Sequence, residues 1–143
     1  MIKTLRQTIS KLVTAYSPVA VEQQSFFINN VTSEIPVEEN AETIYNLLNS
    51  LFYCVARTTT ESCIRVNAAS GSDITELVIS TNSSATNYCF IRKFEHLKML
   101  AAKVGGMLEI TGKDRSKIIF SFINPSKKKD KPASLARALA EFN

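Results

Sequence analysis

Residues 41–57 carry the densest run of helical periodicity in the chain, and this run constrains the fold most. Apolar side chains recur there every three or four residues, which predicts a helix of about five turns with one buried face. Those side chains belong to Ile44, Leu47, Leu48, Leu51, Phe52 and Val55. Two segments typical of strands follow, Cys63–Ala69 and Ile74–Thr81, and the turn sequence at 71–73 joins them as an antiparallel hairpin. A helix and a hairpin with one apolar side each predict a helix packed on a sheet.

The remaining segments extend this unit at both ends. They are a helix over Met1–Tyr16, a strand over Ser25–Val31, a helix over Tyr88–Val104, and strands over Met107–Thr111 and Lys117–Ile123. Pro18 is expected to stop the first helix, and Gly105 the third. Three helices and five strands in this order predict an α/β (α+β) two-layer sandwich. Its five-stranded mixed sheet carries the three helices on one face.

The length of 143 residues suits one domain, which we place at residues 1–125. Residues 126–143 are predicted to be a basic tail with room for a short helix over Ala133–Phe142. The net charge of +4 is concentrated there, in lysines 127, 128, 129 and 131, and the rest of the chain is near neutral. No basic-aromatic pattern accompanies the lysines, so we do not expect nucleic-acid binding.

No apolar run approaches the ~18 residues of a membrane span, and the first 16 residues lack the apolar core of a secretory signal. We therefore expect a cytoplasmic protein with no membrane segment and with reduced thiols at Cys54, Cys63 and Cys89. A zinc site is not expected, because the sequence has no C-x-x-C and a single histidine, His96. A catalytic pair of Cys89 and His96 has no supporting residues around it.

Three strings in the chain fit one known family. Lys103–Ile110 (KVGGMLEI) runs from a helix end through Gly-Gly into an apolar-Glu-apolar strand, and Lys117–Phe122 (KIIFSF) is a second apolar strand. Pro36–Val66 combines a loop, a long helix and a Thr-rich exit into a strand. Together these strings resemble the ATP-binding domain of bacterial sensor histidine kinases, which belongs to the Bergerat-fold (GHKL) group. The resemblance covers about residues 3–124 and implies the same fold.

The resemblance also implies where a nucleotide would bind, and the chain departs from the family there. The family's N-box helix presents an Asn to the magnesium ion that bridges the ATP phosphates. Cys54 takes that position here, with Ser50 at the polar position one turn earlier and Arg57 nearby on the same helix. A neutral thiol is a poor ligand for magnesium, which prefers hard oxygen donors. Asn49 cannot replace it without a shift of register, because five residues turn an ideal helix about 140° away.

Two glycine-containing boxes of the family are altered as well. The Asp-x-Gly box that reads adenine corresponds to Thr81–Ser83 (TNS), which lacks both the Asp and the Gly. The Gly-rich box that holds phosphate on backbone N–H groups corresponds to Ile91–Phe94 (IRKF). The segment left for the ATP lid, 83–90, is short. The altered site positions are Ser50, Cys54, Arg57, Thr81, Asn82, Ser83, Arg92 and Lys93.

A family fold with all three nucleotide boxes altered predicts a non-catalytic signalling or regulatory module, a pseudokinase without a cofactor. We expect it to act by protein–protein binding, with a response regulator or a kinase as partner. The sequence leaves undecided whether the chain forms a homodimer. We expect neither a sensor nor a phosphoacceptor hairpin in this length. The alternative is a divergent ATP-binding catalytic domain of a two-component histidine kinase, which binds ATP with magnesium. Arg92 and Lys93 would then clamp the phosphates in place of the Gly-rich box.

Overall fold

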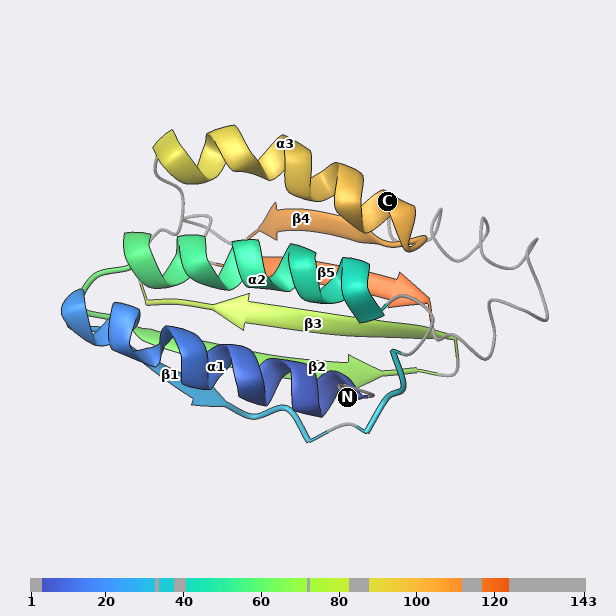
Figure 1. Ribbon diagram of the computed structural model, residues 1–143, viewed down its shortest axis with the longest axis horizontal. Helices are drawn as coiled ribbons and strands as arrows, with labels where there is room; N and C mark the ends of the chain where they lie inside the picture. Colours follow the sequence, from blue (N-terminus) through green and yellow to red (C-terminus); the bar gives the residue numbers. More distant parts are fainter. Residues whose placement is uncertain are drawn as a thin grey trace.

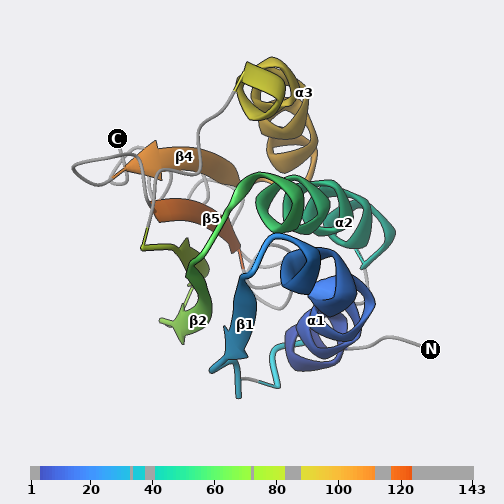
Figure 2. The same ribbon diagram turned by 90° about the vertical axis from the view of Figure 1, so that its left-hand side faces the viewer.

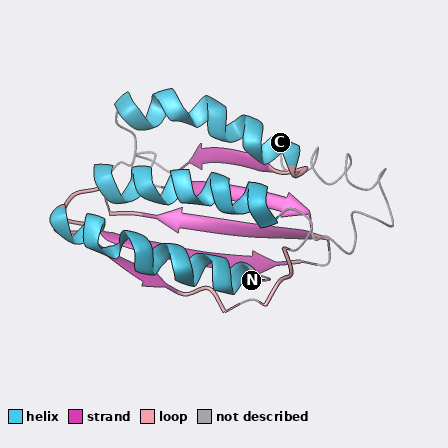
Figure 3. Cartoon of the chain, viewed as in Figure 1, coloured by secondary structure: helices cyan, strands magenta, loops and turns pink. Residues whose placement is uncertain are grey.

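The structure, a computed structural model, describes residues 4–32, 34–37, 41–71, 73–82, 88–111 and 117–123, with the backbone alone for 88–92. The elements are α1 (Leu5–Glu22), β1 (Phe26–Asn29), α2 (Ala41–Thr58), β2 (Cys63–Ser70), β3 (Ile74–Ser80), α3 (Tyr88–Lys103), β4 (Met107–Thr111) and β5 (Lys117–Ile123). The three helices lie side by side over one face of the sheet (Figures 1 and 3). Seen edge-on, helices and strands form two layers, which confirms the predicted fold class (Figure 2).

The strands form one five-stranded sheet in the order β1-β2-β3-β5-β4. β1 runs parallel to β2, with Phe26 opposite Cys63, and the other pairs are antiparallel. A parallel pair needs a long crossover, and α2 supplies it. The predicted hairpin of β2 and β3 is confirmed, and β3 then pairs with β5, placing Leu77 opposite Phe120.

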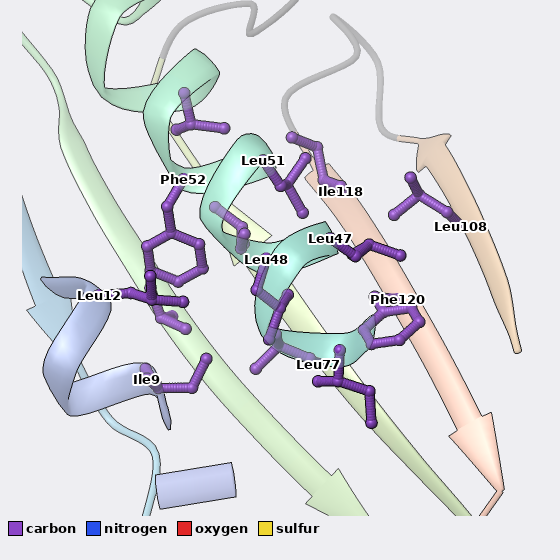
Figure 4. Close-up of a cluster of buried hydrophobic side chains, with 14 of the residues drawn as sticks. Ile9, Leu12, Leu47, Leu48, Leu51, Phe52, Leu77, Leu108, Ile118 and Phe120 are labelled. Carbon is purple, nitrogen blue, oxygen red and sulfur yellow. The ribbon is translucent and has the colours of Figure 1, made fainter. Parts of the chain in front are cut away.

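The core lies between the two layers, and α2 contributes most of its helical side. Phe52 is fully buried and stacks on Phe27 of β1, with ring centroids 5.6 Å apart. Figure 4 shows Leu47 and Leu51 of α2 on the side of β5, and Phe52 on the side of α1. Each such Leu or Phe contributes roughly 1.5–3 kcal/mol through burial. The apolar side chains of α2 thus pack against α1 on one side and against the sheet below it.

The predicted end of the first helix at Pro18 is wrong, because α1 continues through Pro18 to Glu22. Pro18 lies on the exposed side of α1, where water can satisfy the carbonyl that its missing N–H leaves unpaired. At the other end Thr4 forms a capping box with Gln7: the Thr4 hydroxyl accepts from the Gln7 N–H, and the Gln7 side chain accepts from the Thr4 N–H, both at 3.2 Å. This cap fixes where α1 begins.

The predicted glycine stop after the third helix is confirmed, with α3 ending at Lys103. Gly105 adopts a φ of 69°, and the N–H groups of Gly105 and Gly106 donate to the carbonyls of Ala102 and Ala101 at 3.0 and 2.9 Å. These two bonds form a Schellman motif, which satisfies the last carbonyls of the helix. A Cβ atom at Gly106 would overlap the carbonyl oxygen of Ser121 in β5, so only glycine fits there. The Gly-Gly pair therefore ends α3 and lets β4 approach β5.

Several sequence predictions concern segments outside the described residues. They include Ser83, most of the segment expected to form the lid, and the basic tail at 126–143 with Ala133–Phe142. Within the described part, no helix combines the length and the apolar character that crossing a membrane requires.

Candidate functional site

The last two turns of α2 carry three of the predicted site positions. Cys54 is only 3% exposed and belongs to the hydrophobic core, and its carbonyl accepts the Thr58 hydroxyl at 2.7 Å. Ser50 is half-buried, and Arg57 is exposed. The helix therefore turns the predicted magnesium position inward, toward the core, and presents only the polar positions beside it to solvent.

Arg57 and Lys93, two predicted site residues from different helices, meet at the ring of Tyr53. Arg57 donates from Nη1 to the Tyr53 hydroxyl at 2.9 Å, and its guanidinium carbon lies 5.6 Å from the ring centroid. Lys93 of α3 places Nζ 5.5 Å from the same centroid. Each cation–π contact at an exposed site contributes about 0.5–1 kcal/mol. Tyr53 thus holds two cations together between α2 and α3.

Tyr16 of α1 extends this cluster across the helical layer. Its ring lies 5.9 Å from that of Tyr53, and its hydroxyl donates to Asn49 Oδ1 at 2.6 Å. Burial raises the pKa of Tyr16 above its ordinary value of 10.0, and the neighbouring Tyr45 raises it further. Lys11 of α1 lies over the Tyr45 ring, with Nζ 5.4 Å from the centroid. We call this set the tyrosine–cation strip: Lys11, Tyr16, Tyr45, Asn49, Tyr53, Arg57 and Lys93.

The sequence prediction missed the three tyrosines and Asn49 as members of this strip. Their half-buried positions follow the apolar periodicity, which assigns such side chains to the boundary of the core. The spacing of Tyr53 and Arg57, four residues apart on a helix, is the signal that could have found the cluster. The pairings across helices leave no comparable signal in the sequence.

Thr81 and Asn82, at the predicted adenine-reading position, lie at the end of β3 in a network of hydroxyl groups. The Asn82 N–H donates to Ser62 Oγ at 2.8 Å, and the Ser62 N–H donates to Ser25 Oγ at 3.1 Å. Ser25 Oγ in turn donates to the Thr59 carbonyl at 2.8 Å. Thr81 is nearly buried and Asn82 is exposed. The network ties the exit of α2 to the starts of β1 and β2 and to the end of β3.

One buried hydroxyl beside this network has no partner among the described residues: Thr59 Oγ1. Thr59 is fully buried, and its backbone N–H and carbonyl are both hydrogen-bonded, to the Val55 carbonyl and to Ser25 Oγ. The unpaired oxygen therefore costs desolvation without compensation from a described residue.

The predicted site positions gather at one end of the molecule. The end of α2 and the arrowhead of β3 both lie on the left in Figure 1, where the start of α3 also lies. Arg92 belongs to this part of α3, but only its backbone is described, and Ser83 lies outside the described residues. The structure thus brings Arg57 and Lys93 together at the Tyr53 ring. It links Asn82 to the exit of α2 through Ser62 and Ser25.

The donor set at this end does not fit a magnesium ion. Cys54, at the position predicted for the magnesium ligand, is a buried thiol, and the amide oxygen of Asn49 accepts from Tyr16 on the opposite side, toward α1. Magnesium requires oxygen ligands in near-octahedral geometry. Among the described residues, no three His, Cys, Asp or Glu side chains are grouped so that they could hold a metal ion.

A hollow of about 670 Å³ lies elsewhere, along the outer side of α1. Its described lining consists of Arg6, Gln7, Ser10, Lys11, Thr14 and Ala15. The Arg6 side chain there forms an ion pair with Glu34 at 2.6 Å, whereas Lys11 belongs to the tyrosine–cation strip. The strip and the hollow therefore meet at Lys11.

Comparison with known proteins gave matches among solved structures only. No family model and no curated protein sequence matches the chain. The histidine kinase AdeS of Acinetobacter baumannii superposes with a TM-score of 0.67 at 14% identity, over 87% of this chain and 66% of that one. The histidine kinase domain of the blue-light activated kinase of Erythrobacter litoralis gives 0.69 at 11%, over 89% and 64%. This chain thus spans just under two thirds of both structures.

The isolated catalytic domain of the histidine kinase ThkA matches over nearly its whole length. Its TM-score is 0.65 at 11% identity, and the match covers 85% of this chain and 94% of that domain. The same kinase also matches in its complex with the response regulator TrrA, with a TM-score of 0.63. The TM-scores establish a common fold. Because the sequence identities are low, the chemistry of the site has to be argued from the residues present in this chain.

Proposed function

Because the chain has the fold of the ATP-binding catalytic domain of histidine kinases, we propose that it is a signalling module of that fold without nucleotide chemistry. It acts by binding another protein of a two-component system. The proposal takes no cofactor and assigns no catalytic residue.

The observation that carries the proposal is the burial of Cys54. In the register that the family resemblance implies, this position supplies the magnesium ligand, and here a thiol that is 3% exposed lies in the core. Without an oxygen donor there, the triphosphate loses the metal that neutralises its charge. The glycines that would let the backbone approach base and phosphate are missing as well.

The proposed partner is a response regulator or a kinase. The ThkA kinase, which shares the fold, has been solved with a response regulator bound. A bacterial two-hybrid screen of the full chain against the response regulators and kinases of its own genome tests this. We expect one or a few specific partners, and no interaction with any of them would contradict the choice of partner class.

Nucleotide titration tests the central claim. We expect isothermal titration of the full chain with ATP or ADP, each with magnesium, to give no heat of binding into the millimolar range. A kinase domain that binds nucleotide, measured in parallel, is the control for the assay. Micromolar binding would overturn the proposal and favour a divergent catalytic domain, with Arg92 and Lys93 as phosphate clamps.

A further inference from the structure

The tyrosine–cation strip is a continuous surface feature that crosses all three helices. Contacts lead from Lys11 on α1 to Tyr45 on α2, and from Tyr16 on α1 to Tyr53 on α2. Tyr53 then meets Lys93 on α3. Its three cations are exposed, and its tyrosines and Asn49 are half-buried. The strip therefore lies on the solvent side of the helical layer, away from the sheet.

The three cations of the strip have no acidic partner in the described part of the chain. The ion pairs found there are Arg6 with Glu34 and Lys98 with Glu95. Lys11, Arg57 and Lys93 contact aromatic rings instead, which leaves their charge uncompensated. A carboxylate from another molecule would find the cations already held in place, so less side-chain entropy is lost on binding.

The three helices carry the basic excess of the domain. The helical segments α1, α2 and α3 contain seven basic and three acidic residues, a net charge of +4. The rest of residues 1–125 contains five basic and eight acidic residues, a net charge of −3. The helical side therefore attracts acidic surfaces and steers them toward the strip.

We infer that the tyrosine–cation strip is the docking surface for an acidic segment of a partner protein. The inference rests on the proposed function, because it says where that protein-binding module makes its contact. Tyrosine and arginine are the residue types enriched at interface hot spots, since they bury apolar area and still offer hydrogen bonds. The partner's carboxylates pair with Lys11 at one end and with Arg57 and Lys93 at the other.

The length of the strip sets the size of the segment. Tyr45 and Arg57 are twelve residues apart on α2, which is about 18 Å at the rise of an α-helix. An extended chain spans this distance with roughly five or six residues. The hollow along α1 includes Lys11 in its lining and gives the segment room to continue. Two acidic clusters about five residues apart therefore match the strip.

A peptide of this design tests the inference. The probe is a nine-residue peptide with two Asp-Glu pairs separated by five neutral residues, and its control has Asn-Gln in place of each pair. We expect the acidic peptide alone to bind the full chain, measured by calorimetry and by NMR shifts at Tyr53 and Lys93. The double variant Arg57→Glu/Lys93→Glu weakens binding by about tenfold or more, because two attractive contacts become repulsive.

The matched control is Lys98→Glu/Lys103→Glu, which makes the same charge change on exposed residues outside the strip. We expect it to change the affinity by less than about threefold, through long-range attraction alone. Equal losses in both variants, or no binding of the acidic peptide, would overturn the inference and leave the proposed function to the nucleotide titration. Micromolar ATP binding that competes with the peptide would overturn both. Circular dichroism of both variants confirms that they are folded.

Discussion

Cys54 and Thr59, five residues apart at the end of α2, differ in how their polar atoms are satisfied. The Cys54 thiol is a small, weakly polar group that packs within the hydrophobic core. The Thr59 hydroxyl is fully buried and lacks a described partner. Substitutions at these two sites therefore test opposite changes, the addition of a polar group to the core and its removal.

Cys54→Asn should lower the free energy of unfolding by about 1–3 kcal/mol, because the new amide is buried among apolar side chains. Urea unfolding measures this, with Cys54→Ala as the smaller, apolar control. We also expect the variant to gain no ATP binding, since the glycine boxes are still absent. A stable variant that bound ATP with magnesium would place residue 54 in an open cleft instead.

Thr59→Val should raise the free energy of unfolding by about 1 kcal/mol, since it removes a buried unpaired hydroxyl and keeps the shape. Ser25→Ala is the matched contrast: its hydroxyl donates to Thr59 and accepts from Ser62, so its removal should cost about 1–3 kcal/mol. Both are read from urea midpoints. A loss of stability in Thr59→Val would mean that its hydroxyl does have a partner, such as a buried water.

The family resemblance implies the altered site positions, which stay a prediction, and it says nothing of the residues that surround them. Arg57 and Lys93 were predicted as site residues, and they do meet. Tyr53, which joins them, and Tyr16, which extends the cluster, were missed, because contacts between helices depend on how the helices pack. Helical periodicity indicates which face of a helix is buried. It does not indicate which neighbouring helix contacts the half-buried side chains at the edge of that face.

At the scale of elements, all eight predicted helices and strands are present, and the boundaries hold the errors. The first helix passes Pro18, because an exposed proline can remain in a helix when water satisfies the freed carbonyl. The Gly105–Gly106 stop was predicted correctly, since few other residues end a helix in the left-handed conformation. The sequence predicts a helix end well where the backbone requires one residue type, as at Gly105. It predicts a helix end poorly where a residue is only disfavoured inside a helix, as at Pro18.

Gly106→Ala should lower the free energy of unfolding by about 3 kcal/mol or more, because its methyl group overlaps the Ser121 backbone and β4 must move. Gly105→Ala changes the same motif and should cost only about 1–2 kcal/mol, the strain of a left-handed alanine. Thermal and urea unfolding compare the two. A smaller loss for Gly106→Ala than for Gly105→Ala would show that β4 can shift without cost.

The contact of α1 with α2 should make stability depend on pH at alkaline values. The pKa of Tyr16 is raised in the folded state, so above pH 10 the unfolded chain ionises first and the free energy of unfolding falls until the folded pKa is passed. Below pH 10 this contribution is fully present. Tyr16→Phe should lose about 1 kcal/mol at pH 7 with its hydrogen bond to Asn49.

Urea unfolding at pH 8 and pH 11 measures the effect as the difference between the wild type and Tyr16→Phe. We expect the wild type to lose more stability over this interval than the variant. Absorbance near 295 nm follows the ionisation of tyrosine and should show a late-titrating component that disappears in Tyr16→Phe. Equal losses in both proteins would contradict the assignment.

For the whole molecule, one core connects the two layers, and the basic excess of the domain lies on the helices. The near-neutral body predicted from net charge is correct as a sum, but it conceals a basic helical layer and an acidic remainder. Composition could not reveal this, because the division depends on which residues lie in helices. The same folding pattern that buries Phe52 against Phe27 also brings Lys11, Arg57 and Lys93 to the opposite side of the helices.

The shared core predicts a single cooperative unfolding transition. Three of the four tyrosines lie in the tyrosine–cation strip and the chain has no tryptophan, so tyrosine fluorescence reports mainly on the helical layer. Far-UV circular dichroism reports on helices and sheet together. We expect the two urea transitions to coincide within error. An earlier fluorescence transition would mean that the helical layer separates from the sheet before the sheet unfolds.

The parallel pairing of β1 with β2 limits the order in which a nascent chain can acquire this structure. Phe26 pairs with Cys63, and all of α2 lies between them in sequence. While the ribosome extends the chain, β1 emerges before α2 and has no strand to join until β2 has also left the exit tunnel. β2 and β3, in contrast, can close as a local hairpin soon after synthesis. β1 is therefore secured in the sheet only after α2 and β2 have been made, although it precedes both in the sequence.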